Sequence, residues 1–405
     1  MKLRSIEQFY ENLGARSQAN LDNAISRIVE TKRRNGKVML VIGSGPNLHE
    51  GVTTLVAELM DKGIVDSVTT SSAVIAHEMG GSLDRVKRVK ASELGFDPDS
   101  HFLPKGGVFE FSMMGDDELD LLRKEMVIDD ELLRKGRAVD GDVIIKAAGN
   151  MAYPVGLRTE NLSTEILTIA QTYGLPFETV AGWGADPRTM IGMGAQKGKP
   201  VLVTVPQLVG GGNVGLAVAD SIPVSRRCAR IAAMMEEADV IIESAVALTQ
   251  EIHDGPFECY TGHGIWAYWN GLQTTSLKGK TLIRIDLDEN LLKAKDAQED
   301  SKQIQEAIDK GLPKTKITGI PFRMEMSAFA RLEGSIPVVG DIGEVWPIIA
   351  SKVADALGIS LDFMSYPQQT TEGQQMREWL VESVKPVDRE KILNRLKTFG
   401  QSEAT

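Results

Sequence analysis

The densest group of reactive side chains in the sequence lies between residues 250 and 266, in the stretch QEIHDGPFECYTGHGIW. Carboxylates attract an ammonium group, and the face of a tryptophan ring can cover a cation. This composition therefore predicts a site for a small amine. Its candidate residues are Glu251, Asp254, Glu258, and one of Trp266 and Trp269.

The same stretch has two other interpretations. His253, Cys259 and His263 could bind a metal, although the spacing H-x5-C-x3-H matches none of the usual zinc patterns. His253 could instead accept a proton from a substrate. The stretch could also be a polar loop whose side chains satisfy one another.

A second candidate is the pair His77-Glu78, which follows TTSSAVIA at the expected start of a helix. The two side chains could form an acid–base pair or orient a substrate, and the alternative is an ordinary pair on a helix surface. Ser44 lacks a surrounding G-x-S-x-G, so a hydrolase triad has no support there.

The elements that must position these residues alternate along the chain. Short apolar runs predict strands, and the segments between them predict helices such as 51–62, 164–173, 225–237 and 345–357. The expected strands lie at residues 37–43, 65–71, 142–149, 200–205, 238–244, 281–287 and 335–341. This alternation predicts a mostly parallel, doubly wound α/β sheet with helices on both faces.

Ligands of such sheets bind at the carboxyl ends of the strands, where this sequence carries small and hydroxylated residues. The first expected strand runs into GSGPNLHEG, which matches neither G-x-G-x-x-G nor a phosphate loop. It is either a structural turn or a cofactor turn backed by a helix dipole. The cofactor candidates at these strand ends are Gly43, Ser44, Gly45, Asn47, Thr70, Ser71, Ser72, Gly210, Gly211, Gly212, Ser244 and Asp341.

The three consecutive glycines at 210–212 have two interpretations. Glycines leave the backbone bare, so a flat or charged ligand can approach it closely. The alternative is a flexible loop between a strand and a helix.

Composition limits the function classes. The 405 residues are 42% hydrophobic with a net charge of −11, which suits a soluble enzyme and argues against nucleic acid or anionic membranes as partners. Only Cys228 and Cys259 are present, so no disulfide framework is expected. The sequence shows neither a signal peptide nor a membrane span, and we expect a cytoplasmic protein.

Three parts are expected along the chain. Residues 1–36 form a helical segment, 37–360 an α/β domain with a charged insertion around 288–330, and 361–405 a helical extension.

Six segments, in this order, resemble the deoxyhypusine synthase family. They span most of residues 40–360 and are GIVDSVTTSSAVIAHEM, GVFEFSMMGDDELDLL, EILTIAQTYGLPFETVAGWGADPRTMIG, LVGGGNVG, EADVIIESAVALTQEIHDG and IPVVGDIGEVWPIIASKVADALG.

This resemblance implies a Rossmann-like sheet of the deoxyhypusine synthase type, an NAD cofactor, a polyamine substrate and a homotetramer. It implies NAD contacts at Thr70, Ser71, Ser72, Asp186, Gly211, Gly212 and Asp341, and polyamine contacts at Asp254 and a tryptophan. The family's Trp-Gly-Lys triplet is absent, so Lys278 or Lys280 would have to replace its lysine, and Asn213 follows the glycines where the family has a histidine.

Three functions remain open on the sequence alone. The first is an NAD-dependent transferase or oxidoreductase acting on a polyamine or another small amine. The second is a metal-dependent hydrolase or lyase, and the third is a non-catalytic paralogue that binds NAD or another ligand.

Overall fold

The structure of the protein is a computed structural model. It describes residues 2–43, 45–97, 107–149, 152–204, 206–208, 210–244, 277, 279–286 and 334–402, and the single positions 289, 292, 293, 296, 306 and 310. The chain divides into two compact units. Unit 1 comprises Met1–Ser71, Lys197–Val205 and Pro223–Gly373, and unit 2 comprises Ser72–Gln196, Pro206–Ile222 and Gln374–Thr405.

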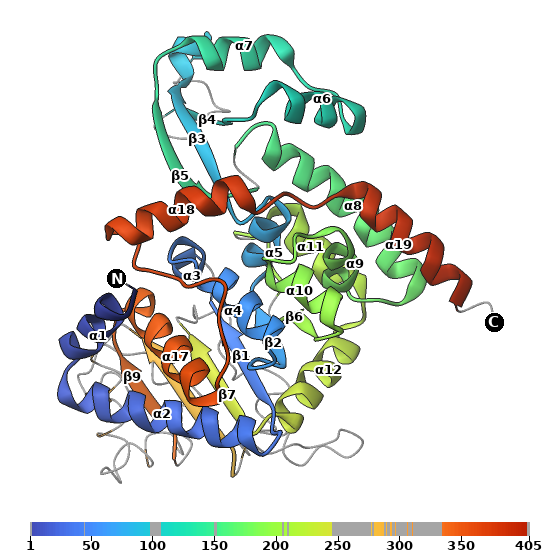
Figure 1. Ribbon diagram of the computed structural model, residues 1–405. Coiled ribbons are helices and arrows are strands. Elements are labelled where there is room, and N and C mark those ends of the chain that lie inside the picture. The colour runs from blue at the N-terminus through green and yellow to red at the C-terminus, as the bar shows by residue number, and fades with distance from the viewer. Residues whose placement is uncertain are drawn as a thin grey trace. The chain divides into compact units, whose positions relative to one another are not determined.

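Unit 1 is built on a parallel sheet of six described strands (Figure 1). Every neighbouring pair in this sheet runs parallel. The strands are β1 (Val38–Ile42), β2 (Ser67–Thr70), β6 (Val201–Val203), β7 (Val240–Ser244), β8 (Thr281–Asp286) and β9 (Ile336–Val339). Their order across the sheet is β6-β2-β1-β7-β8-β9. The predicted parallel sheet is therefore confirmed.

Helices lie on both faces of this sheet. α12 (Val224–Glu237) shares one apolar cluster with Met39 and Val41 of β1. α2 (Ala15–Arg33) contacts β9 and packs against α17 (Ile342–Leu357). α1 (Lys2–Asn12) packs against α17 as well. All five residues of β1 are buried, as expected for a strand covered on both faces.

The first connection of the sheet contains two helices, α3 (Gly45–His49) and α4 (Val52–Asp61). Gly51 separates them with φ of 69°. α4 confirms the helix predicted at 51–62. α1 and α2 confirm that the amino-terminal segment is helical.

Unit 2 contains a three-stranded antiparallel sheet in the order β4-β3-β5. Its strands are β3 (Leu83–Lys90), β4 (Val108–Ser112) and β5 (Asp142–Ala147). One face packs on α6 (Asp116–Glu125) and α7 (Asp130–Ala138) through a cluster that includes Phe111, Leu119 and Leu133.

The remaining helices of unit 2 pack beside one another, with α8 against α9 and α11, and α9 against α19. They are α5 (Ser72–Met79), α8 (Val155–Tyr173), α9 (Phe177–Gly184), α10 (Met190–Lys197), α11 (Gly212–Ser221), α18 (Thr371–Ser383) and α19 (Arg389–Ser402). α18 and α19 lie within the segment 361–405, which was expected to be helical.

Two expectations about organisation need correction. The run at 142–149 does form a strand, but β5 is the edge of the antiparallel sheet rather than part of the parallel one. Its apolar residues resemble a buried parallel strand, whereas Val143 is 50% exposed. The units also differ from the expected boundaries at 36 and 360, because the chain leaves unit 1 after Ser71 and returns at Lys197.

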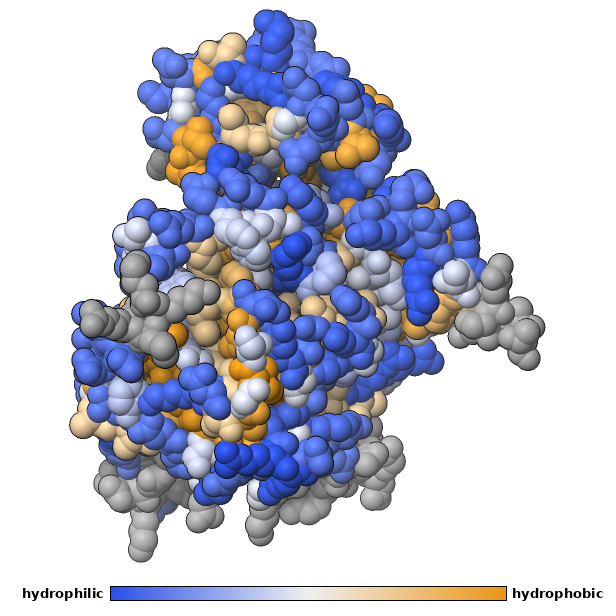
Figure 2. Space-filling model, viewed as in Figure 1, coloured by the Kyte–Doolittle hydropathy of each residue, from blue (hydrophilic) through white to orange (hydrophobic). Residues whose placement is uncertain are grey.

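In Figure 2 the apolar side chains over the small sheet and its helices are scattered, whereas in the lower part of the view they gather in a band. Scattered exposed apolar residues are normal for a folded protein. Of the helices in the described ranges, none is long and apolar enough to cross a membrane.

Candidate functional site

The strand order of unit 1 reverses between β1 and β7. From β1 the chain proceeds through β2 to β6 on one side, and then through β7, β8 and β9 on the other. In chain order this is 3-2-1-4-5-6, the arrangement in which dinucleotides bind across the crevice at the reversal. The two carboxyl ends meet there, where the Gly43 N–H donates to the Ser244 carbonyl at 2.9 Å.

A buried network of hydrogen bonds supports this point. Asn47 Nδ2 donates to the carbonyls of Gly43 (3.2 Å) and Ser244 (3.3 Å), and Ser244 Oγ donates to Asn47 Oδ1 at 3.0 Å. Trp346 Nε1 donates to Ser244 Oγ at 2.8 Å. Both predicted cofactor residues, Asn47 and Ser244, are therefore engaged inside the protein, where they fix the shape of the turn.

The turn after β1 leaves space above Gly45. A side-chain carbon added to Gly45 would meet no atom within 4 Å. The expectation that a helix dipole backs this turn is wrong. The helix that follows, α3, has only five residues, and Gly51 separates it from α4. A ligand at this turn would meet bare backbone instead.

Hydroxyl groups gather at the carboxyl ends of β2 and β6. Thr70 Oγ1 donates to the Ile42 carbonyl at 3.2 Å, and the Thr204 N–H donates to the Thr70 carbonyl at 3.0 Å. The buried hydroxyls of Thr69 and Thr204 have no hydrogen-bond partner in the described part of the chain. Both hydroxyl oxygens are buried and not exposed at the surface of the crevice.

Asp341 lies at the other side of the sheet, after β9. It caps α17, where its Oδ1 accepts from the Gly343 N–H at 2.8 Å. Burial, and then the Asp341 charge, raise the pKa of the half-buried Glu344. β9 is two strands beyond β7, so Asp341 is not brought to the reversal point.

The triple glycine is packed against unit 2 itself. A side-chain carbon at Gly211 would lie 2.7 Å from Ser72 Oγ, and one at Gly212 would lie 2.2 Å from Glu160 Oε1. Glu160 Oε2 accepts from the Asn213 N–H at 2.8 Å, and Ser72 Oγ donates to the Gln207 carbonyl at 3.0 Å. The carboxylate of Glu160 thus occupies the amino end of α11.

Gly210 differs from its two neighbours. It is exposed, with φ of 76°. Ser71 is buried at the end of β2.

Asp186 joins two parts of unit 2. Its Oδ1 accepts from the Arg188 N–H at 2.9 Å, and its Oδ2 accepts from the Lys385 N–H at 3.1 Å. The Arg188 guanidinium also bonds both oxygens. These contacts attach the loop after α9 to the carboxyl-terminal segment.

His77 lies in the last turn of α5, not at a helix start as expected. Its Nδ1 donates to the Ala148 carbonyl at 2.5 Å, since a carbonyl can only accept. Burial is the main cause that lowers the pKa of His77, and the charge of Lys146 adds to it. The neutral ring keeps Nε2 as an acceptor, which is the form that a general base requires.

Glu78 points to other partners than its neighbour, so the expected acid–base pair is wrong. Its carboxylate is fully buried and accepts from the N–H groups of Met190 (2.8 Å) and Ile191 (3.1 Å) at the start of α10. Burial raises the pKa of Glu78 to about 7. Glu78 is a helix cap.

Sequence reasoning missed a polar cluster beside His77. Asp84 of β3 lies directly opposite Lys146 of β5, and Ser112 Oγ of β4 donates to Asp84 Oδ2 at 2.5 Å. Lys146 Nζ bonds Glu110 Oε2 at 2.6 Å. The apolar residues of β3, Leu83, Val86 and Val89, are three positions apart, so the local pattern predicted neither this strand nor its pairing across the sheet.

Lys280 does not fit the role of the replaced lysine. Its Nζ donates to the carbonyls of Glu236 and Ala238, both at 2.6 Å, at the end of α12. It also directly precedes β8, at the amino edge of the sheet, whereas ligands bind at the carboxyl edge.

Several predicted residues lie outside the described ones. They are Ser44, Glu251, His253, Asp254, Glu258, Cys259, His263, Trp266, Trp269 and Lys278. In the part of the chain that the structure describes, no group of three or more His, Cys, Asp or Glu residues could hold a metal ion.

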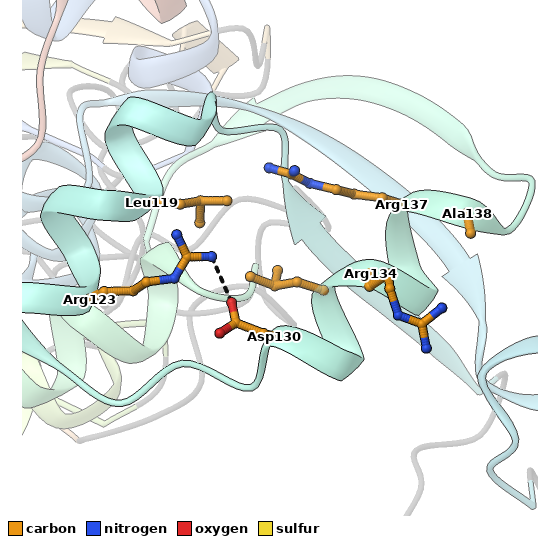
Figure 3. Close-up of a pocket in the computed structure, with 7 residues that line it drawn as sticks. Leu119, Arg123, Asp130, Arg134, Arg137 and Ala138 are labelled. Atoms are coloured by element: carbon orange, nitrogen blue, oxygen red, sulfur yellow. Dashed lines mark hydrogen bonds and ion pairs between the residues drawn. The ribbon is translucent and has the colours of Figure 1, made fainter.

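A cavity of about 500 Å³ lies between α6 and α7, away from every predicted site residue. Figure 3 shows the Arg123 guanidinium directed at Asp130, while that of Arg134 points away. Arg123 bonds Asp120 and Asp130, and Arg137 bonds Asp116. Three arginines and one aspartate line this cavity, so its lining carries an excess of positive charge.

No family model and no curated protein matches the chain. Solved structures that align with it include an arginine dihydrolase, ArgZ, from cyanobacteria, at 10% identity and a TM-score of 0.38, over 85% of this chain and 32% of that one. A putative LOR/SDH protein from Methanococcus maripaludis S2 aligns at 9% and 0.39, over 84% and 67% of the chains.

AgrE, crystallised with ornithine and NAD+, aligns at 12% identity and a TM-score of 0.39, over 85% of this chain and 34% of that one. The chain thus spans about a third of the length of ArgZ and AgrE. Alignments of this quality carry no argument about what the chain binds or does.

Proposed function

We propose that the protein is an NAD-dependent enzyme acting on a small amine. The observation that carries the cofactor is the strand order 3-2-1-4-5-6 of unit 1, with its reversal between β1 and β7. The amine class is supported by the resemblance to deoxyhypusine synthase and by the acidic and aromatic residues at 250–269. The proposed reaction is either an oxidation of the amine or a transfer of part of it to an acceptor.

The residues at the crevice fit a dinucleotide. The open space above Gly45 admits a ligand to the backbone. Asn47 and Ser244 would not contact the ligand. Their hydrogen bonds fix the turn that the ligand would meet. NAD, when bound, would supply the acceptor for a hydride.

His77 of unit 2 stays a predicted proton acceptor. Its Nδ1 bonds the Ala148 carbonyl, and burial is the main cause that lowers its pKa. The homotetramer and the cytoplasmic location expected from the sequence stay predictions.

The test is an absorbance assay for NADH with a panel of amines that includes spermidine and putrescine. We expect NAD-dependent turnover with at least one amine of the panel.

Two results would point elsewhere. NAD binding without turnover on any amine would favour the non-catalytic paralogue. A stoichiometric metal in the purified protein, without NAD binding, would favour the metal-dependent enzyme.

A further inference from the structure

β5 is an edge strand of the small sheet in unit 2. Among the described strands it pairs only with β3, and Figure 1 shows it along the left side of this sheet. The edge of a sheet presents unpaired N–H and C=O groups, which are a template for pairing with a strand of another chain. The free edge of β5 is therefore a candidate interaction surface.

Hydrogen bonds at the end of β5 show which backbone groups face this edge. The Ala148 N–H, directly after β5, donates to the Ser82 carbonyl, directly before β3, at 2.9 Å. Residues of an antiparallel strand alternate between its two sides, so every second residue back from Ala148 also faces β3. These inward-facing residues are Asp142, Ile144 and Lys146. The N–H and C=O groups of Val143 and Ile145 therefore point to the free edge.

The middle of β5 is apolar and exposed. Val143 is 50% exposed and Ile144 is 38% exposed. α18 reaches the strand one residue later, where Arg377 Nη2 donates to the Ile145 carbonyl at 2.5 Å. A backbone carbonyl has two lone pairs, so this one can accept a second N–H in the plane of the sheet.

The charges on one face of the sheet alternate in sign up to the edge. Arg88 of β3 lies opposite both Glu110 of β4 and Asp142 of β5, and its Nε lies 3.3 Å from Glu110 Oε1. This row of three ends on a carboxylate at the edge. Four residues along β5, Lys146 lies opposite Asp84 and also bonds Glu110, so this row ends on a cation.

One register makes β5 complementary to itself. When two copies pair antiparallel about a twofold axis at Ile144, Asp142 lies opposite Lys146 of the partner subunit. Val143 then lies opposite the partner's Ile145, and these edge-facing residues exchange the ladder hydrogen bonds. Ile144 meets its own copy as a non-hydrogen-bonded pair. Opposite charges and apolar side chains directly across two strands both stabilise the pairing.

The neighbouring registers match less well. An axis at Asp142 or at Lys146 places like charges opposite each other, which destabilises a strand pair. An axis at Val143 or at Ile145 places a charged side chain opposite Ile144. An axis between two residues pairs an edge-facing residue with an inward-facing one, so the ladder cannot form.

We propose that the protein forms a dimer by antiparallel pairing of β5 with β5 of a second copy, about a twofold axis at Ile144. The pairing joins two three-stranded sheets into one and removes both free edges. Because the edge is short, we expect a dissociation constant of about 10 μM. The inference does not depend on the proposed function, since it concerns the small sheet alone.

The first test is disulfide cross-linking of the full chain, with Cys228 and Cys259 replaced by serine. Ile144→Cys should form a covalent dimer on oxidation, because the two copies of a residue at the axis lie about 4.5 Å apart at Cα. Val143→Cys is the matched control on the same strand. Its two copies lie diagonally, at about 7–8 Å or more, which a disulfide does not span, although Val143 is the more exposed residue.

Sedimentation equilibrium measures the dimer without a cross-link. Asp142→Lys should weaken it about 10-fold, because a lysine then faces the partner's Lys146 at both ends of the pairing. Asp117→Lys, which changes an exposed aspartate on α6, should leave the dissociation constant unchanged. In the wild type, protection of the Val143 and Ile145 N–H groups from hydrogen exchange should rise with protein concentration.

Three results would overturn the proposal. A wild type that stays monomeric at about 100 μM would leave this edge to a strand of another protein. Cross-linking of Val143→Cys as efficient as that of Ile144→Cys would exclude the register. A dimer that Asp142→Lys weakens no more than Asp117→Lys does, without concentration-dependent protection at the edge, would place the interface elsewhere.

Discussion

Glu78 is a fully buried carboxylate whose oxygens accept from the first N–H groups of α10. Its pKa is about 7 in the folded state against an ordinary 4.5, because burial disfavours the charged form. Between these two pH values the Glu78 carboxyl is ionised in the unfolded chain but still protonated in the folded protein. The free energy of unfolding should therefore fall by about 3 kcal/mol as pH rises through this window.

Glu78→Gln should remove this pH dependence, since an amide does not titrate there. Urea unfolding of wild type and variant at several pH values measures it, with the exposed Glu131→Gln as control. Parallel stability curves for wild type and Glu78→Gln from pH about 4.5 to about 7 would contradict the account.

His77 and Glu78 show how far sequence reasoning reaches at the scale of residues. The sequence identified both as candidates, but successive residues of a helix point in different directions and do not face each other. One side chain therefore bonds the segment after β5 and the other caps α10. Asp84 gave no sequence signal, because its partner Ser112 is 28 residues away in the chain.

At the scale of elements, apolar runs located the strands of unit 1 well. β1 and β7 are buried along their whole length. β1 is entirely apolar, and β7 begins with three apolar residues. The pattern did not reveal β3, because its apolar residues Leu83, Val86 and Val89 are three positions apart, whereas a half-buried strand alternates every two. It placed β5 in the wrong sheet, since local sequence does not state which strand a segment will pair with.

The two glycine-rich turns differ in what surrounds them, and this difference predicts opposite responses to substitution. A side-chain carbon on Gly215 would lie 1.8 Å from the Gln207 carbonyl, whereas one on Gly45 would meet nothing within 4 Å. Gly215→Ala should destabilise the protein by about 1–3 kcal/mol. Gly45→Ala should be neutral or slightly stabilising.

Thermal unfolding of the two alanine variants beside the wild type measures this contrast. Equal effects would show that the packing around the second turn is not as described. The sequence could not separate the two turns, because the atoms that crowd Gly211 and Gly212 come from Ser72 and Glu160.

At the scale of the whole molecule, the strand order of unit 1 is the feature that most limits function. The alternation of strands and helices predicted a parallel sheet, but not its order. The reversal arises because β7 pairs with β1 on the side opposite β2. β6 pairs with β2, although residues 72–196 of unit 2 separate them in sequence. This long excursion explains why the chain did not divide where the sequence suggested.

The most direct test of the central claim is calorimetric titration of NAD into folded, nucleotide-free protein, for wild type, Gly45→Val and Gly115→Val. Gly115 is the matched control in unit 2, where an added side-chain carbon meets only Glu118, at 3.9 Å. The account predicts binding in the micromolar range, at least about 10-fold weaker in Gly45→Val and unchanged in Gly115→Val. Absence of binding in the wild type, or equal binding in all three proteins, would contradict a dinucleotide site at the reversal point.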